Sequence, residues 1–216
     1  MADASIQTGL EQAVEQLGLT VSPIEIQRLL GFMDLLQRWN SSYNLTAVRD
    51  PQQMLSQHLA DCLAVIRPMR RQLGPREAAR VLDVGSGAGL PGVVIAALNP
   101  ELQVVCVDAV GKKAAFITQV IAELKLRNLD SMHARVEALK AVPFDLVTSR
   151  AFASLADFVS LTRAHLEVGG VWMAMKGKRP EAELDALPPT VRVFHVEQLV
   201  VPGLNADRCL VWMNST

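Results

Sequence analysis

The chain has 216 residues, enough for one α/β domain with a modest extension. With 50% hydrophobic residues, 20% charged residues and a formal net charge of −1, the composition argues against a strongly basic protein that coats nucleic acid. The three cysteines form no CxxC pair and the four histidines have no zinc-type spacing, so we expect free thiols and no metal. The sequence also lacks a signal-peptide pattern and a bilayer-length apolar run, which predicts a cytoplasmic protein without a membrane partner.

The first seventy residues have the apolar spacing of helices. Residues 22–25 (Ser-Pro-Ile-Glu) are typical of a capping box with proline in the first helical turn. Asp50-Pro51 predicts the start of another helix, which Pro68 is expected to end. Because no flexible linker follows, we interpret residues 1–79 as a helical extension packed on a core of residues 80–216, in one structural domain overall.

From residue 80 onward, strand-like apolar runs alternate with helical stretches. This alternation predicts an α/β fold, a doubly wound, Rossmann-like parallel sheet with helices on both faces. The last two runs are joined through Pro202-Gly203, which favours an antiparallel pair at the sheet edge. The expected strands cover residues 81–84, 104–107, 131–133, 146–148, 171–175, 191–196 and 209–213, and the expected helices cover 91–98, 111–126 and 155–166.

Residues 83–92 (Asp-Val-Gly-Ser-Gly-Ala-Gly-Leu-Pro-Gly) are the most informative stretch of the sequence. A buried strand ends here, the backbone turns through three alternating glycines, and a helix begins. Glycine is needed where φ is positive or where a ligand approaches the backbone without meeting a Cβ atom, and amides at a helix start bind anions. Asp83 can orient this loop or accept a hydrogen bond from a ligand's ammonium group. We interpret the turn as the S-adenosylmethionine site of a methyltransferase.

Other glycine-rich turns fit this stretch less well. A nicotinamide site has the pattern G-x-G-x-x-G, whereas here the third glycine comes one residue early and Leu90 occupies the expected place. A P-loop ends in Gly-Lys-Ser/Thr, and no such triplet follows. A glycine-rich connection without any ligand is the remaining alternative.

Two later loops extend the expected nucleoside site. Asp108 ends the second strand ~20 residues after the glycine turn, where an acidic residue can accept both ribose hydroxyls. Capping the following helix is a competing role for the same side chain. Val136 and Glu137 follow the third strand, where the loop would border an adenine, although an exposed Arg-x-Glu pair is also typical of a solvated surface.

Several separate motifs lie in a characteristic order along the chain. Besides the glycine-rich turn, they are residues 39–50 (Trp-Asn-Ser-Ser-Tyr-Asn-Leu-Thr-Ala-Val-Arg-Asp), 108–116 (Asp-x-x-x-Lys-Lys-x-x-Phe), 135–137 (Arg-Val-Glu), 144–153 (Phe-Asp-Leu-Val-Thr-Ser-Arg-Ala-Phe-Ala) and 176–177 (Lys-Gly). Together they resemble the small-subunit ribosomal RNA methyltransferase G family, also called glucose-inhibited division protein B. The resemblance runs from about Leu17 to Trp212, and Ala88 stands where many members have proline.

This resemblance implies a class I S-adenosylmethionine-dependent methyltransferase fold, with a mostly parallel seven-stranded sheet and an N-terminal helical extension. It implies methyl transfer to the ring nitrogen N7 of one guanosine in the 530 loop of 16S rRNA, near the decoding site. The partner is then 16S rRNA or the small ribosomal subunit, and we expect a monomer. The expected cofactor contacts are Asp83, Gly85, Gly87, Leu90, Asp108, Ala109, Val110, Val136, Glu137 and Arg150.

The expected chemistry needs neither a metal nor a general base, because the target nitrogen carries no proton. Positioning and charge complementarity remain. Arg150 lies just beyond a strand end, where open sheets place ligands, and is the main candidate catalytic residue; Lys176 is the second. Arg150 can bind the guanine edge, the cofactor carboxylate or an RNA phosphate.

Basic residues near the strand ends predict a phosphate-binding face and a salt-dependent RNA affinity. The candidate RNA-binding residues are Lys112, Lys113, Arg135, Lys176, Lys178 and Arg208. Three other functions stay open: methylation of another RNA, a small molecule or a protein; a sensor that binds the cofactor without turnover; and a nicotinamide oxidoreductase, which the early third glycine disfavours.

Overall fold

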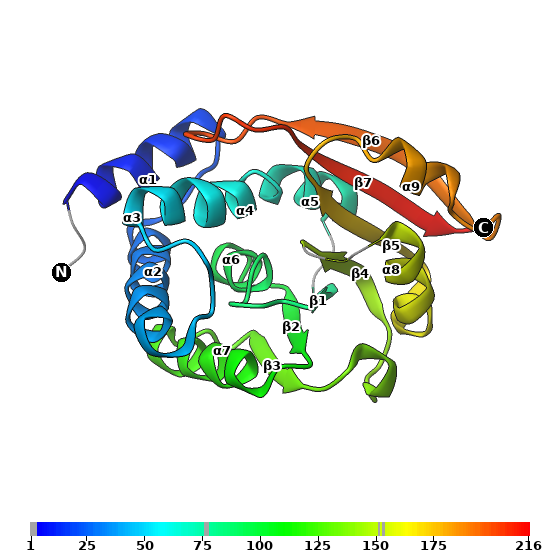
Figure 1. Cartoon of the computed structure of the whole chain (residues 1–216), viewed down its shortest axis with the longest axis horizontal. Helices are drawn as coiled ribbons and strands as arrows, with labels where there is room; N and C mark the ends of the chain where they lie inside the picture. The colour runs from blue at the N-terminus through cyan, green and yellow to red at the C-terminus, as the bar shows by residue number, and fades with distance from the viewer. Residues whose placement is uncertain (1–3, 76–77, 151, 153) are drawn as a thin grey trace.

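The computed structural model describes residues 4–75, 78–150, 152 and 154–216 (Figure 1). Ala151 and Ala153, which belong to the 144–153 motif, lie outside the described residues, as do residues 1–3 and 76–77 of the expected extension. Within the described residues, no helix combines the length and the apolar character needed to cross a membrane.

The extension is helical, as expected, and its longest helix begins at the predicted capping box. The Ser22 amide donates to Glu25 Oε2 at 2.6 Å, and the Glu25 amide donates to Ser22 Oγ at 3.4 Å, so each residue satisfies a backbone donor of the other. The helices are α1 (Ala4–Gln16), α2 (Pro23–Tyr43), α3 (Pro51–Met54), the π-helical turn η1 (Leu55–Ala60), α4 (Asp61–Leu63) and α5 (Ile66–Leu73).

The expectation that Pro68 ends a helix is wrong. The consecutive helical segments that begin at Pro51 end before Ala64 and Val65, which form a turn. Pro68 lies in the first turn of the next helix, α5. Proline is tolerated there because an amide in the first turn has no intrahelical acceptor. The helix ends instead before Gly74, which adopts a φ of +64°.

The remaining chain forms a seven-stranded sheet with the order β3-β2-β1-β4-β5-β7-β6. The first five strands of the chain run parallel, and β7 is antiparallel to both β5 and β6, which confirms the doubly wound class and the antiparallel C-terminal pair. The strands are β1 (Arg80–Val84), β2 (Gln103–Asp108), β3 (Leu129–His133), β4 (Phe144–Ser149), β5 (Leu166–Lys176), β6 (Val191–Leu199) and β7 (Arg208–Ser215).

Helices cover both faces of this sheet. On one face α6 (Gly92–Leu98), α7 (Gly111–Leu124) and the extension share a core that includes Val81 of β1. On the other face α8 (Leu155–Thr162) shares a core that includes the next residue of β1, Leu82. The alternation follows from the two-residue repeat of a strand, which points successive side chains to opposite faces. In Figure 1 the N-terminal helices lie on the side of α6, and α8 and α9 lie beyond β4 and β5. The other short helices are η2 (Val136–Ala138), η3 (Arg163–His165) and α9 (Glu181–Asp185).

The carboxyl ends of the parallel strands meet at one edge, where open α/β sheets bind ligands. The antiparallel strand β7 begins at the same edge, because Cys209 pairs in register with Lys176 at the end of β5. The fold thereby brings the glycine-rich turn, Asp108, Arg150 and Arg208 to one side of the molecule.

Candidate functional site

The first two glycines of the 83–92 turn face open space. Gly85 and Gly87 have φ values of +64° and +59°, a region that favours glycine. A Cβ atom on Gly85 would meet no atom within 4 Å, and one on Gly87 would meet only the Gly85 carbonyl oxygen, at 4.0 Å. At Gly89, by contrast, a Cβ atom would lie 2.6 Å from Val93 Cγ2. The first two glycines therefore leave room for a ligand, and the third allows α6 to pack.

Asp83 fastens this turn and keeps one acceptor unused. The side chain is completely buried, and its Oδ2 accepts a hydrogen bond of 2.8 Å from the Gly92 amide at the start of α6. Its Oδ1 has no hydrogen-bond partner among the described residues. Burial raises the pKa of Asp83 to about 7, opposed by the Gly92 amide and by Arg150. An unused buried carboxylate oxygen beside an open backbone turn fits the ammonium group of the expected cofactor.

Asp108 ties the glycine turn to the next loop. Its Oδ2 accepts from the Gly87 amide at 2.9 Å and its Oδ1 accepts from the Val110 amide at 2.8 Å. Lys113 Nζ lies 3.8 Å from Oδ2. The N-cap of α7 is Val110, not Asp108, so the competing role is a loop brace rather than a helix cap. Each carboxylate oxygen has two lone pairs, so ribose binding by Asp108 stays a prediction that this geometry permits.

Three other expected cofactor contacts, Leu90, Ala109 and Val110, occupy two different environments. Leu90 is buried in the core and its amide donates to the Ser86 carbonyl at 2.9 Å, so its contact with the cofactor stays a prediction. Ala109 and Val110 are exposed beside Asp108.

The loop after β3 borders the same site. The Ala134 amide donates to the Asp108 carbonyl at 3.2 Å, which holds the two strand ends together. The Val136 carbonyl in η2 accepts from His165 Nε2 at 2.8 Å, while the Glu137 side chain is exposed. The Val136 amide and the Glu137 carboxylate are therefore the groups left for the predicted adenine contact.

Arg150 joins the methyltransferase core to the helical extension. Its Nη1 donates to the Gln57 carbonyl at 3.1 Å and lies 3.4 Å from His58 Nδ1 and 3.6 Å from Asp61 Oδ2. All three partners belong to η1 or to the first residue of α4. Arg150 directly follows β4, and Thr148 of β4 pairs in register with Asp83 of β1, so the ends of these two strands lie side by side.

A chain of hydrogen bonds links Arg150 to the 39–50 motif. Thr46 Oγ1 lies 2.9 Å from His58 Nε2, and the Thr46 amide donates to Asn40 Oδ1 at 2.9 Å. Burial, and then the charge of Arg150, lower the pKa of His58 to about 4. His58 is thus neutral at physiological pH, with Nδ1 toward the arginine donor and Nε2–H toward Thr46.

A cavity of 440 Å³ opens beside this network. It is lined by Gln57, His58, Asp61, Arg150, Met175, Lys176, Gly177 and Arg208. Arg208 Nε donates to Asp61 Oδ1 at 2.9 Å, so the carboxylate forms ion pairs with both arginines that line the cavity.

Lys176 has a carboxylate partner. Its Nζ lies 2.8 Å from Glu183 Oε2 and 3.0 Å from Oε1, and it lies 3.4 Å from the Phe152 carbonyl. Glu183 also accepts from the Leu155 amide at 2.7 Å. This arrangement connects β5, α8 and α9, and the catalytic and RNA-binding roles of Lys176 stay predictions.

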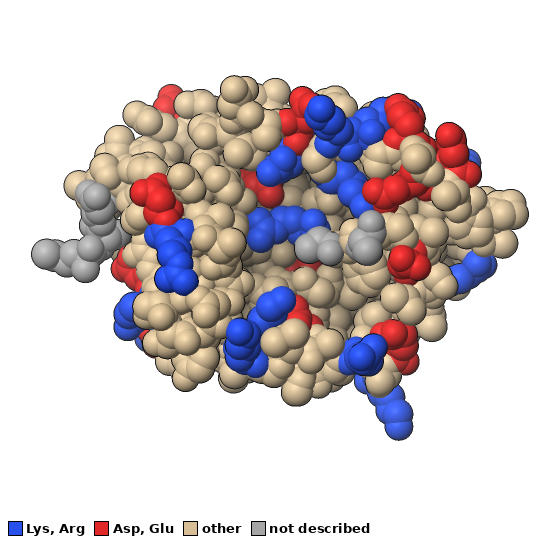
Figure 2. All heavy atoms as spheres, in the orientation of Figure 1, with Lys and Arg blue, Asp and Glu red and all other residues tan. Residues whose placement is uncertain are grey.

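The other basic candidates lie around the same edge. Lys112 Nζ donates to the Tyr43 carbonyl at 2.7 Å, Lys113 pairs with Asp108, and Arg135 is exposed. Figure 2 shows lysine and arginine side chains around and within a hollow near the centre of one face of the molecule. Such a distribution favours phosphate binding in spite of the net charge of −1.

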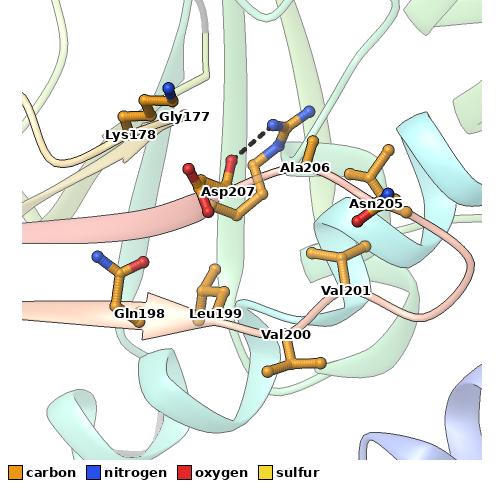
Figure 3. A pocket seen from close by; sticks show the side chains of 11 residues that line it. Gly177, Lys178, Gln198, Leu199, Val200, Val201, Asn205, Ala206 and Asp207 are labelled. Atoms are coloured by element: carbon orange, nitrogen blue, oxygen red, sulfur yellow. Dashed lines mark hydrogen bonds between the residues drawn. The ribbon is translucent and has the colours of Figure 1, made fainter.

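Lys178 and Arg208 line a second cavity of 620 Å³ (Figure 3). Gly177 and Lys178 form one side of it, and the loop from Val200 to Asp207 curves around the other. The dashed line in Figure 3 is the 2.8 Å bond from Arg208 Nη1 to the Asp207 carbonyl. The two cavities share Gly177 and Arg208 and are therefore neighbours.

Sequence reasoning missed the part of the site contributed by the extension. The sequence predicts a packing helix over Gln57, His58 and Asp61, and the π-helical turn that presents Gln57 and His58 has no simple sequence signature. One signal was available: Asp61 is a lone charge in the apolar run 59–66 (Leu-Ala-Asp-Cys-Leu-Ala-Val-Ile). A buried carboxylate of this kind requires a partner. Within the described residues, no group of three or more His, Cys, Asp or Glu side chains could hold a metal ion.

Solved structures show the same fold. TrmN from Thermus thermophilus superposes with a TM-score of 0.58 at 19% identity, over 75% of this chain and 53% of that chain. A SAM-dependent methyltransferase from Aquifex aeolicus gives a TM-score of 0.56 at 16% identity, over 79% of this chain and 96% of that chain. At these identities the likeness concerns the class I fold alone, which it confirms.

Sequence relatives are much closer. The chain is 57% identical over 210 residues to the ribosomal RNA small subunit methyltransferase G of Methylibium petroleiphilum, covering 97% of this chain and 95% of that protein. It is 60% identical over 199 residues to the protein of the same name from Leptothrix cholodnii, covering 92% and 91%. The family model for rRNA small subunit methyltransferase G matches residues 25–211. The resemblance found in the motifs is thereby confirmed, and the chain belongs to the rRNA small subunit methyltransferase G family.

Proposed function

We propose that this protein transfers a methyl group from S-adenosylmethionine to N7 of a guanosine in the 530 loop of 16S rRNA. The observation that carries the proposal is the unused Asp83 oxygen beside the open Gly85 and Gly87 backbone, at the edge where Arg150 also lies. The names of the curated relatives support ribosomal RNA as the substrate. The choice of N7 rests on the family resemblance of the motifs.

The residues of the chain have separate tasks in this reaction. S-adenosylmethionine, when bound, supplies a methyl group that its sulfonium has already activated. Asp83 accepts from the cofactor ammonium, the glycine backbone lies against it, and Asp108 accepts from its ribose. Because guanine N7 carries a lone pair and no proton, no residue has to act as a base. Arg150 positions the reactants at the strand ends, where preorganised charge has its largest effect.

The proposed partner is 16S rRNA, either free or in the small ribosomal subunit. Lys112, Lys113, Arg135, Lys178 and Arg208 give the edge of the sheet the charge needed to hold the phosphate backbone. With this partner the protein acts in the cytoplasm, and we propose that one copy of the chain suffices, since the described cofactor and RNA residues all belong to one sheet edge.

Transfer of tritium from labelled cofactor tests the proposal. The acceptor is 16S rRNA that lacks the modification, offered both free and within small subunits, followed by mass mapping of the methylated guanosine. We expect one labelled nucleoside in the 530 loop, and we expect mass mapping to identify it as 7-methylguanosine. Label in another RNA, in protein or in a small molecule, with none in 16S rRNA, would assign a different substrate.

Arg150→Ala is expected to lower kcat/KM in this assay at least 100-fold, while cofactor-free protein stays folded. The lost stability is on the order of 1–3 kcal/mol, because Asp61 keeps its bond to Arg208. Arg38→Ala is the matched control, since Arg38 is exposed on α2 and pairs with Glu123 at 3.4 Å. An unfolded Arg150→Ala protein, by circular dichroism, would instead assign Arg150 a structural role.

A further inference from the structure

Asp61 is a buried carboxylate that the reaction described above does not use. It opens α4, directly after the π-helical turn η1, and its side chain is 4% exposed. Together with Gln57 and His58 it forms the part of the 440 Å³ cavity that comes from the extension. A π-helical turn is rare and frequently occurs at functional sites.

The two carboxylate oxygens of Asp61 differ in their hydrogen bonding. Oδ1 accepts a hydrogen bond of 2.9 Å from Arg208 Nε. Oδ2 lies 3.6 Å from Arg150 Nη1, which is too long for a hydrogen bond, and it has no closer donor among the described residues. Buried carboxylates normally fill their acceptor positions, because each unmet one costs free energy. An oxygen with acceptor capacity left, in the wall of a cavity, points to a ligand that donates hydrogen bonds.

The cavity lies next to the expected methyl donor. Arg150, in the cavity wall, directly follows β4, and Thr148 of β4 pairs in register with Asp83 near the end of β1. The cavity therefore lies at the same sheet edge as the glycine-rich turn that follows β1. Its volume falls in the range of roughly 300–1,000 Å³ typical of small-ligand sites. A nucleobase that has left the helical stack requires a pocket of this kind.

We propose that this cavity binds the target guanine and that Asp61 accepts hydrogen bonds from its N1–H and its N2 amino group. The inference rests on the proposed function and names the recognition element of the same site. Guanine alone among the four bases presents two adjacent donors on its Watson–Crick edge, which a carboxylate matches in a bidentate manner. The edge that carries N7 lies on the opposite side of the ring and stays free to face the methyl group.

This contact also favours the reaction itself. When the N7 lone pair forms the new bond to the methyl carbon, the electrons of the broken carbon–sulfur bond stay on sulfur, and positive charge passes to the guanine ring. The N1–H group becomes more acidic, so its hydrogen bond to the Asp61 carboxylate strengthens. An interaction that is stronger in the transition state than in the ground state raises kcat.

Inosine tests the proposal, because it retains N7 and N1–H but lacks the N2 amino group. The RNA is 16S rRNA with guanosine or inosine at the methylated position, introduced by ligation of a synthetic segment and offered free and in reconstituted small subunits. Methylation is measured as kcat/KM, and RNA affinity is measured with S-adenosylhomocysteine present. We expect wild-type protein to prefer guanosine over inosine about tenfold or more, in line with other paired hydrogen bonds to a base edge.

Asp61→Asn is expected to lose this preference in both measurements, since the amide turns one acceptor into a donor. Asp207→Asn is the matched control: it removes an exposed acidic charge next to Arg208, outside the 440 Å³ cavity, and should keep the preference. Melting temperature and S-adenosylhomocysteine affinity check that Asp61→Asn is folded.

A preference retained by folded Asp61→Asn would overturn the inference and leave Asp61 as a brace for Arg150 and Arg208. Equal use of guanosine and inosine by wild-type protein would overturn it without any variant, so the test does not depend on Asp61→Asn folding. In both cases transfer to 16S rRNA would still support the proposed function. If wild-type protein methylates neither RNA, the proposed function and the inference fail together.

Discussion

Asp83 shows how a single side chain can stabilise the fold and still leave one hydrogen-bond acceptor unused. One oxygen fastens the start of α6, and the other has no hydrogen-bond partner among the described residues. Burial disfavours the charged form and raises the pKa to about 7. An ammonium group at the free oxygen would favour the charged form again, so ligand binding and ionisation are coupled.

We therefore expect the affinity for S-adenosylhomocysteine to rise as the pH rises through about 7, because the carboxylate ionises there. Asp83→Asn should bind at least tenfold more weakly at pH 8, and its affinity should vary less between pH 6 and 8. Isothermal titration calorimetry measures both quantities, and Asp130→Asn, an exposed carboxylate on β3, is the control. A pH dependence that persists in Asp83→Asn would assign it to another group.

The same pKa has a consequence for stability. A carboxyl group whose folded pKa is raised stabilises the folded state below its unfolded pKa of 3.8, and this contribution is lost as the pH rises through about 7. Asp83→Asn lacks that loss. The melting temperature of Asp83→Asn relative to wild type is therefore expected to increase between pH 5 and pH 8, as measured by calorimetry. A constant difference across this range would show that Asp83 is ionised throughout.

His58 acts in the opposite direction. Its pKa of about 4 in the folded protein lies below the unfolded value of 6.5, so its contribution is complete above pH 6.5 and is lost as the pH falls toward 4. The neutral ring keeps Nδ1 as an acceptor for Arg150. Neither property was predictable from the sequence, because Arg150 is 92 positions away along the chain.

At the scale of elements, the glycine-rich turn was predictable in detail. Residue types at fixed spacing after a strand determine where the backbone turns, and the structure confirms a strand, a turn and a helix in that order. What the sequence did not distinguish is the use of each glycine. Gly85 and Gly87 face open space, whereas Gly89 and Gly92 are required by side chains packed against them, among them Cys106.

Gly87→Val is expected to abolish cofactor binding, because the new side chain would occupy the space in front of the turn. Gly74→Val is the matched control: Gly74 has a φ of +64° and a Cβ atom there would meet no atom within 4 Å, but Gly74 follows α5 and precedes β1, whereas the turn follows β1. Both variants should lose about 1–3 kcal/mol of stability through backbone strain. Only Gly87→Val should fail to bind S-adenosylhomocysteine by calorimetry, and binding by this variant would mean that the cofactor lies elsewhere.

The extension was predictable as a set of helices but not as part of the site. Local signals placed the capping box of α2 and the start of α3 at Pro51 correctly. The rule that proline ends a helix failed at Pro68, because it does not say on which side of the proline the chain breaks. The π-helical turn η1 has i→i+5 hydrogen bonds, which the periodicity of an α-helix does not indicate.

For the whole molecule, the distribution of charge matters more than its sum. A net charge of −1 argues against a protein that coats nucleic acid, yet basic residues gather near the strand ends, at the edge of the sheet that carries the glycine-rich turn. Lys178→Gln is expected to weaken binding to 16S rRNA and to reduce the slope of log affinity against log salt by about 0.7 per lost phosphate contact. Arg127→Gln, an exposed charge in the loop before β3, should leave the slope unchanged. An unchanged slope in Lys178→Gln would remove it from the RNA-binding face.

We also propose that residues 1–79 and 80–216 unfold as one unit, because a single hydrophobic core contains both Leu29 of α2 and Trp212 of β7. Denaturation in urea followed by the fluorescence of Trp39, in the extension, and of Trp172 and Trp212, in the sheet, should give one midpoint. Single-tryptophan variants separate the signals. An earlier midpoint for Trp39 would show that the extension is a separate cooperative unit.

The sequence by itself determined the fold class, the alternation of strands and helices along the chain, the position of the glycine-rich turn, and the family. These features follow from residue types and their spacing within short segments, so each can be recognised without knowledge of the tertiary structure. The cavity and its carboxylate were decided only by the tertiary structure, since Asp61, Arg150 and Arg208 come from three distant segments. A buried charge becomes a binding group or a brace according to the partners that folding brings to it, and those partners have no fixed spacing in the chain.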